Sequence, residues 1–478
     1  MNKIIKIFAL AVIFTFAASN HSHISAQDVS PLYFSTQPQA ANYNPAWLTN
    51  NNFYISMPVF SRLDFGLHTS GFAYKDLINK HPQYDSLRVD VDGFLNKLKK
   101  SNYFDLNFAT DILGVGFKVK NNFFSIQIGV NVESKLRFSK QLFEFAVHGT
   151  DMAQKHADLL DARIFDATAY VTTALGYARE INDQLTVGGK FKIYSGIANV
   201  HTNKSTVNLD INDGELAAYG DLDMDIAIPF GKPTLTKNSV FEDDSEFDFN
   251  TDDGSFGKMF KNMGFGVDLG FAYKINDQME ISASIVDLGW INWKSNAVKV
   301  HSKNPGERVY FSGLETDYDN IGDDLDNYFD DMADSVKKAF DLTIDDNDGY
   351  KTMMPTKIYI GYSWNFFDNM YLHSLYYGRI IAGTLENALN LTYTYKAGPV
   401  QMSVGNTFRS TFFNPNFLLS LGSIFYIGAS FSSSFNVAST SGMNAYMGVN
   451  IAFAADKHKS KARTVKKAET TSEVELIF

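Results

Sequence analysis

Large apolar side chains alternate with small or polar ones along residues 263–274. One set of alternate positions holds Met263, Phe265, Val267, Leu269, Phe271 and Tyr273. The other set holds Gly264, Gly266, Asp268, Gly270, Ala272 and Lys274. This period of two predicts a β-strand, because a helix would scatter the apolar groups around its circumference. Tiny residues and single charges on the second face favour a crowded barrel interior over bulk water.

The same alternation recurs along most of the chain. It predicts an all-β fold, a transmembrane antiparallel β-barrel of about 14 strands, with a range of about 12–16. The expected strands cover residues 53–73, 104–118, 123–137, 164–179, 185–199, 263–274, 279–293, 356–365, 369–381, 387–396, 399–409, 415–423, 425–435 and 443–454. An even number of strands returns both ends of the barrel to one side of the membrane.

The tetrapeptide INDQ occurs twice between expected strands, at residues 181–184 and 275–278. Two copies could mark a binding motif, a duplicated domain or one turn used twice. Four residues with a single acid provide too few ligands for a cation, and the similarity fades beyond one hairpin. Asn and Asp tolerate tight turns, so both copies are predicted to be chain reversals at the periplasmic rim.

Long polar segments lie between the short turns, near residues 75–103, 138–162, 200–262 and 294–355. They are predicted to be outer loops, because outer-membrane barrels have short periplasmic turns and longer outside loops. One of them carries a helical pattern, formed by Leu325, Phe329, Met332, Val336 and Phe340. This spacing predicts a short amphipathic helix in an outer loop.

The ends of the chain suggest export. Residues 1–26 combine Lys3 and Lys6, a short apolar run and Ala26, as in a secretory signal peptide. Residues 27–50 are expected to lie in the periplasm or in the lumen, and 51–455 to form the barrel. Residues 456–478 are expected to be a basic periplasmic tail, whose last residues resemble the signal read by the barrel-assembly machinery. The predicted location is the outer membrane of a Gram-negative bacterium, surrounded by outer-membrane lipid.

Composition excludes several classes of function. A net charge of -11 argues against nucleic acid as a partner. The absence of cysteine excludes disulfides, thiolate metal sites and cysteine nucleophiles. Carboxylates gather at residues 241–254, 315–331 and 341–349, but no segment has the spacing of a calcium-binding loop, so solvated outer loops are favoured. No metal or cofactor is expected.

Two sets of polar residues are candidates for chemistry. His68 and Ser70 have a spacing found in some barrel phospholipases, but a polar lumen pair is favoured and no enzymatic activity is expected. The second set faces the predicted lumen and consists of Asp268, Lys190, Lys192, Glu133 and Arg379. These charges could form a conduction or binding track, or they could pair across the lumen and hold the barrel rigid.

Several stretches resemble known barrels. Asn44, Pro45 and Ala46, within QPQAANYNPAW, are similar to a segment near the mature start of FadL-type transporters. Three longer stretches, at residues 174–200, 264–293 and 354–364, resemble an uncharacterised outer-membrane β-barrel family of Bacteroidota. That family is catalogued only as a domain of unknown function. The resemblance implies an outer-membrane barrel and no particular activity.

Three hypotheses of function follow. The first is passage or binding of a small molecule, hydrophobic ones included, gated by the N-terminal segment and the acidic outer loops. The alternative is a structural or protein-docking platform, as in a secretion or surface-attachment complex. A barrel lipase is a third and weaker hypothesis, which would depend on Ser70.

Overall fold

The fold is described from a computed structural model of the chain. The residues it describes are 30–47, 51–80, 86–148, 156–158, 163–212, 215–235, 247–252, 254–312, 341–381, 384–408 and 413–454. Among these residues no helix is both long and apolar enough to cross a membrane. The predicted helix at 325–340, the signal peptide and the tail lie outside the described residues.

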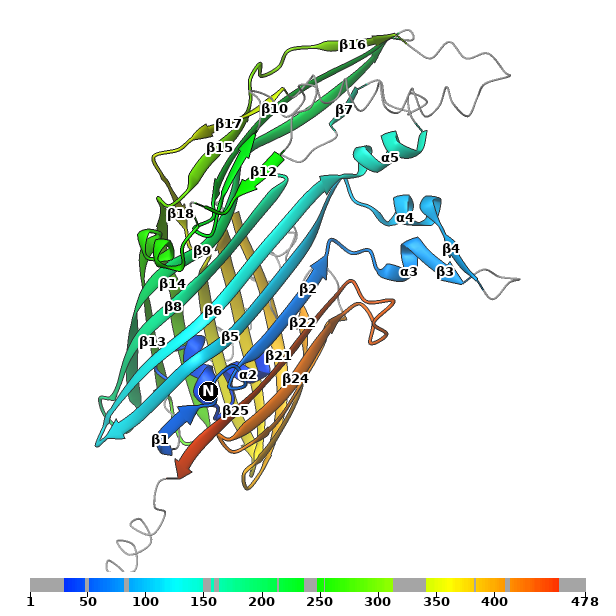
Figure 1. The fold of residues 1–478 in the computed structure, drawn as a ribbon. Helices are drawn as coiled ribbons and strands as arrows, with labels where there is room; N and C mark the ends of the chain where they lie inside the picture. The colour runs from blue at the N-terminus through cyan, green and yellow to red at the C-terminus, as the bar shows by residue number, and fades with distance from the viewer. Residues whose placement is uncertain are drawn as a thin grey trace, which may run out of the picture.

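Antiparallel strands of one sheet close into a barrel of fourteen strands among the described residues, which confirms the predicted fold class (Figure 1). In order around the barrel they are β1 (Asn51–Ser56) with β2 (Leu63–Thr69), β5 (Ser101–Val119), β6 (Asn122–Ser139), β8 (Phe165–Glu180), β9 (Leu185–Asn212), β13 (Met263–Lys274), β14 (Met279–Trp293), β19 (Thr356–Phe367), β20 (Met370–Ile381), β21 (Thr384–Ala397), β22 (Val400–Phe408), β23 (Pro415–Leu421), β24 (Phe425–Ser432) and β25 (Gly442–Ala454). β25 pairs with β1 and β2, so the barrel leaves no open edge.

The two faces of the strands differ as the alternation predicts. On β13 the outward Phe265, Leu269 and Phe271 are exposed, whereas the inward Asp268 is buried. The same apolar exterior continues around the barrel. In a closed sheet each strand pairs its backbone with two neighbours, and the apolar exterior suits a hydrocarbon environment.

The first barrel strand is interrupted, contrary to the prediction of one strand over 53–73. β1 and β2 pair with the same neighbours, but residues 57–62 leave the ladder between them. Val59 adopts a left-handed φ of 66°, which a β-strand cannot accommodate. Its backbone N–H still donates to the carbonyl of Asp111 at 2.8 Å, so the segment stays anchored to the wall.

Both INDQ copies form the same turn, as predicted. The Oδ1 atom of Asn182 accepts backbone hydrogen bonds from Gln184 and Leu185, at 2.9 and 2.7 Å. The Oδ1 atom of Asn276 accepts the equivalent bonds from residues 278 and 279, at 2.9 and 2.8 Å. The asparagine side chain therefore accepts two backbone hydrogen bonds in each reversal, and in the second copy the Asn276 carbonyl also accepts one from Met279 at 3.4 Å.

The predicted outer loops 200–262 and 294–355 contain strands instead, which corrects that expectation. β9 continues beyond the barrel and pairs with β10 (Glu215–Ala227), and the sheet goes on through β15 (Ala297–Ser302) and β17 (Leu342–Asp346). We call β10, β15 and β17 with the upper part of β9 the outer extension; Figure 1 shows it rising past the rim. Its smaller members are β7 (His156–Asp158), β16 (Val309–Ser312) and β18 (Tyr350–Met353). Nearby lie β11 (Lys232–Leu235), β12 (Phe247–Asn250) and η4 (Phe256–Lys261).

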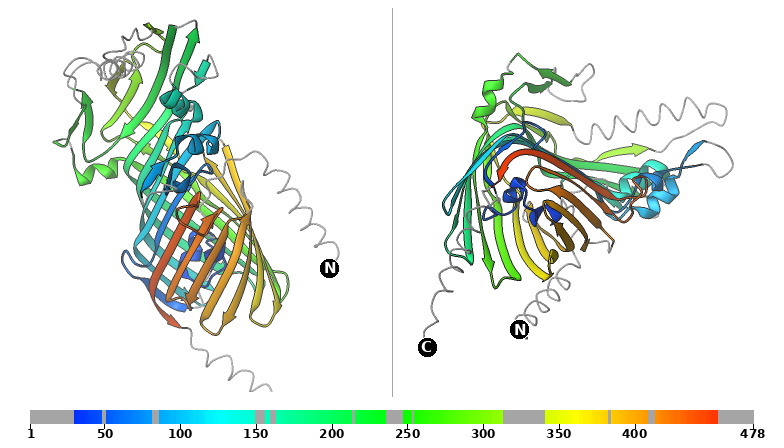
Figure 2. Two further views of the ribbon diagram at one scale, coloured as in Figure 1. Left: turned by 90° about the vertical axis from the view of Figure 1, so that its right-hand side faces the viewer. Right: turned by 90° about the horizontal axis from the view of Figure 1, so that it is seen from below.

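A small lobe projects sideways from the same rim (Figures 1 and 2). It consists of α3 (Tyr74–Leu77), β3 (Ile78–Lys80), β4 (Leu87–Val89), α4 (Val91–Lys97) and α5 (Lys140–His148). Phe72, Phe94, Leu95 and Leu98 form its core together with Phe138 of β6. We call residues 72–80 and 86–100, together with α5, the rim lobe.

Candidate functional site in the lumen

The N-terminal segment 30–47 lies inside the barrel at its short-turn end, as the view from below shows (Figure 2). It contains α2 (Ser30–Tyr33) and η2 (Pro38–Asn42). Gln37 Nε2 donates to the carbonyl of Gly422 at 2.6 Å, and Gln39 Nε2 donates to Asn450 Oδ1 at 2.9 Å. Polar side chains thus tie the segment to the turns and walls around it. We call residues 30–47 the plug.

The Asn44–Ala46 segment of the plug contacts the barrel wall directly. Asn44 Nδ2 donates to the carbonyl of Phe271 at 3.1 Å, and Asn44 Oδ1 caps the backbone N–H of Ala46 at 2.9 Å. The facing wall position is Gly188, where a Cβ atom would lie 2.2 Å from the Pro45 carbonyl oxygen. Glycine is therefore required there by the close contact of two backbones.

Apolar side chains of the plug fill the lower lumen. Leu32 and Tyr33 are fully buried, and the Tyr33 ring stacks on Tyr359 of β19 with centroids 5.7 Å apart. Across the lumen the same cluster includes Tyr426 and Tyr446, from β24 and β25. Burying each such side chain stabilises the arrangement by roughly 1.5–3 kcal/mol. The plug is thus packed as a core element between opposite walls.

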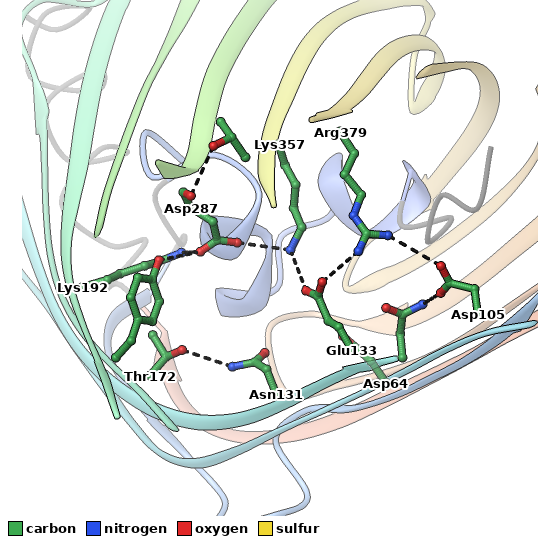
Figure 3. Close-up of polar contacts among 12 residues, drawn as sticks. Asp64, Asp105, Asn131, Glu133, Thr172, Lys192, Asp287, Lys357 and Arg379 are labelled. Atoms are coloured by element: carbon green, nitrogen blue, oxygen red, sulfur yellow. Dashed lines mark hydrogen bonds and ion pairs between the residues drawn. The ribbon is translucent and has the colours of Figure 1, made fainter. Parts of the chain in front are cut away.

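A network of ion pairs crosses the lumen above the plug (Figure 3). Lys192 of β9 contacts Asp268 at 2.8 Å and Asp287 at 2.5 Å. Asp287 also contacts Lys357 of β19 at 3.1 Å, and Lys357 lies 3.5 Å from Glu133 of β6. Acids and bases therefore alternate along a path that joins facing strands.

The network continues toward the outer end of the lumen. Arg379 of β20 contacts Glu133 at 2.8 Å and Asp105 of β5 at 3.9 Å. Lys135 contacts Glu386 of β21 at 2.8 Å, which links β6 with the opposite wall. We call the set Lys192, Asp268, Asp287, Lys357, Glu133, Arg379, Asp105, Lys135 and Glu386 the transverse network.

A second group of charges lies next to the plug. Arg62 Nε donates to Asp64 at 2.7 Å, and an Arg62 nitrogen lies 3.8 Å from Asp111. Lys190 donates to Asn42 Oδ1 of the plug at 2.8 Å. This lysine therefore connects β9 directly to η2.

Asp287 reaches the lumen because of a β-bulge. The β13–β14 register shifts between Val267 and Leu269, and Asp287 adopts a left-handed φ of 60° opposite the shift. Its backbone N–H donates to Asp268 Oδ1 at 2.8 Å. Bulges re-aim side chains, and a non-glycine residue in this conformation costs of order 1 kcal/mol or more. The contacts of Asp287 with two lysines offset that cost.

Two cavities flank the transverse network. The outer one has a volume of about 270 Å³ and is lined by Asp105, Glu133, Arg379, Asp166 and Met354, among others. We call it the vestibule, since its lining residues come from the outer ends of the strands. The inner void, of about 60 Å³, separates the network from Asn42 and Tyr43 of the plug. The transverse network thus separates the vestibule from the inner void.

Comparisons with known proteins place the chain in a family. Residues 45–430 match the profile described as "Family of unknown function (DUF5723)". The chain belongs to this family. A search of curated proteins gives no match.

Solved barrels resemble this DUF5723 protein at low identity. The Pseudomonas putida toluene transporter TodX has 9% identity and a TM-score of 0.38, over 87% of this chain and 94% of that chain. A TodX deltaS2S3 mutant, titled a monoaromatic hydrocarbon channel, has 10% identity and a TM-score of 0.40, over 88% and 95%. A Pseudomonas aeruginosa FadL homologue has 8% identity and a TM-score of 0.29, over 88% and 95%.

All five lumen charges predicted from sequence point inward in the DUF5723 chain. Lys192, Asp268, Glu133 and Arg379 join the transverse network, whereas Lys190 contacts the plug. The prediction missed Lys357. Ile358 and Ile360 belong to the outward set of alternate positions on β19, so the neighbouring Lys357 belongs to the inward set. The prediction also missed Asp287, because the bulge reverses the phase of the alternation there.

The other candidate residues have separate partners. His68 Nε2 bonds to Asn444 Oδ1 at 3.1 Å, and Ser70 Oγ bonds to Asn102 Oδ1 at 2.7 Å. The structure thus gives each of them an asparagine partner. In the acidic stretch 341–349, Asp345 contacts His301 at 2.8 Å. Within the described ranges no group of three or more acids and histidines is arranged to hold a metal ion.

Proposed function

We propose that this DUF5723 protein is a gated outer-membrane barrel that admits a small molecule from outside. The molecule would enter the vestibule, and passage would require the transverse network and then the plug to move aside. The apolar exterior of the closed barrel supports a membrane location. We place the barrel in the outer membrane of a Gram-negative bacterium. The sequence resemblance described above supports Bacteroidota as the source.

One observation carries the proposal: both obstructions are held by contacts that can be exchanged without breaking a covalent bond. The network consists of ion pairs between strands, and the plug is joined to the wall by hydrogen bonds and packing. A solute with its own charges could replace some of these partners. A purely rigid barrel would be stabilised as well or better by apolar packing in place of buried ion pairs.

The vestibule indicates the kind of solute. Arg379, Lys135 and Glu133 present charges of both signs, beside the apolar Met354 and Ile381. A small polar or amphipathic molecule satisfies this mixture, whereas a pure hydrocarbon would remove water from the ion-paired groups without offering them a polar contact. We therefore refine the expectation of a hydrophobic solute toward an amphipathic one.

Single-channel conductance in planar bilayers tests the gate. The intact protein should be mostly closed, and deletion of residues 30–47 should raise the open fraction and the conductance. Adding Glu133→Gln and Lys357→Met to this deletion variant should raise the conductance further, because the network then loses the contact between β6 and β19. Absence of conductance in the combined variant would refute the proposal. Lys204→Met with Asp221→Asn, an exposed ion pair on the outer extension, serves as the matched control.

The platform hypothesis is supported by a different observation. The outer extension carries the sheet well past the rim, and β16 and β17 lie at its margins (Figure 1). Free strand edges can pair with a strand of another protein. A platform predicts a stable protein partner recovered with the intact chain and lost when residues 297–312 are replaced by a short linker. It also predicts no conductance from the plug deletion.

A further inference from the structure

The rim lobe rests on the outward side of the barrel wall. Phe104 of β5 is 41% exposed on the apolar exterior, and its ring lies 5.1 Å from that of Phe72 in the lobe. Phe138 points to the same side of β6 but is buried beneath the lobe. Leu136, two residues nearer the barrel centre, is again exposed. The lobe therefore begins where the lipid-facing belt ends.

The hairpin at the tip of the lobe exposes apolar side chains. Leu87 and Val89 of β4 are 68% and 60% exposed. They point to the same face, because residues two apart on a strand do so. Ile78 lies opposite Val89 on β3 and shares that face. Val91 at the start of α4 is exposed as well. An apolar edge of this kind is unusual on a surface in contact with water alone.

The lobe is also locally basic within an acidic chain. Lys75, Lys97, Lys99 and Lys100 are exposed, and none of them forms an ion pair with a described residue. Arg88 of β4 lies on the face of the hairpin opposite Leu87, 4.0 Å from Asp90. The described residues of the lobe hold seven lysines and arginines against the four acids Asp76, Asp90, Asp92 and Glu144, whereas the complete chain has a net charge of -11.

We propose that the rim lobe docks on the surface of the outer leaflet, with the β4 edge among the headgroups and its lysines facing their anionic groups. Three observations select lipid as the occupant. The lobe projects sideways from the barrel, over the region that lipid must fill (Figure 2). Its core is continuous with the lipid-facing belt at Phe104. Exposed apolar and basic side chains together match the composition of interfacial membrane-binding segments.

A fluorescence experiment on the full-length protein tests the docking. Because the chain has no cysteine, Leu87→Cys can carry a single environment-sensitive dye. Two matched sites have similar exposure: Leu269 on the lipid-facing side of β13, at 61%, and Tyr310 on β16 of the outer extension, at 64%. Each variant is reconstituted in phosphatidylcholine vesicles containing a nitroxide quencher near the headgroups, with or without phosphatidylglycerol.

We expect the dye at position 87 to be quenched nearly as strongly as that at 269 in vesicles with phosphatidylglycerol, and the dye at 310 to remain unquenched. Replacing Lys97, Lys99 and Lys100 by Gln, or adding salt, should reduce the quenching at 87 only. Equal quenching with and without phosphatidylglycerol would overturn the role of the lysines. If the emission of the dye at position 87 indicated as much contact with water as that of the dye at position 310, in vesicles of both compositions, the docking itself would be overturned. Heat-modifiable gel migration verifies that each variant is folded.

Discussion

At the scale of single residues, the lumen is distinguished by ion pairs between buried charged side chains. Lys192 is 9% exposed and is the shared partner of Asp268 and Asp287. Lys192→Met would leave both carboxylates without their principal cation. Removing one partner of a buried ion pair typically costs about 3–5 kcal/mol, so we expect a loss of that order in the free energy of unfolding. Urea titration of the reconstituted barrel, followed by heat-modifiable migration, measures it.

The same substitution on the same strand provides the control. Lys204 of β9 pairs with Asp221 on the outer extension, but its side chain is 58% exposed. Exposed ion pairs contribute about 0–1 kcal/mol, so Lys204→Met should be nearly neutral. Equal effects of the two substitutions would show that burial does not determine the strength of the Lys192 pairs.

At the scale of elements, the outer extension should respond to pH. The hydrogen bond with Asp345 raises the pKa of His301 above its usual value, and so pairing of β15 with β17 favours the protonated ring. A raised pKa in the folded state gives stability that is complete below the unfolded pKa of about 6.5 and is lost as pH rises through the folded pKa. Amide exchange in β15, corrected for intrinsic rates, should therefore become faster as the pH rises above about 6.5. His301→Gln should abolish this dependence, and a pH-dependent loss in that variant would contradict the assignment.

The strands that can be predicted from sequence are those of the closed barrel, whose outer face is apolar. Val267 and Leu269 must be apolar there, so the alternation is strong and its period is unambiguous. In the outer extension this constraint is absent: β10 carries Asp221, Asp223 and Asp225 at alternate positions, with the apolar Leu222 and Met224 between them. The acidic residues make such strands polar overall, so the sequence pattern favours loops there. The break at Val59 also left no signal in the hydrophobic pattern, because Val is a strong strand former.

At the scale of the whole molecule, the lumen site could be predicted only in part. Inward charges follow from alternation, but their pairing depends on the diameter and flattening of the barrel, which no local pattern encodes. Lys357 and Glu133 are 224 residues apart in sequence and meet only after closure. The contact between plug and wall also forms only after closure of the barrel, since Asn44 and Phe271 are 227 residues apart in sequence. Glycines on the inward face, such as Gly188 and Gly270, are a local trace of that contact, as is the Asn44–Ala46 segment itself.

Gly188 therefore allows the plug to be loosened without deleting it. Gly188→Ala would force its Cβ to within 2.2 Å of the Pro45 carbonyl oxygen, and the plug must move because both contacting groups are backbone. We expect a higher open fraction in bilayers and faster maleimide labelling of a cysteine placed at Ser35. Gly189→Ala is the matched control: it faces outward, and its nearest contact, the Asp268 carbonyl oxygen, would be 3.3 Å away. If both variants behave like the parent protein, the plug is not held at Asn44–Ala46 and the gate must lie in the transverse network alone.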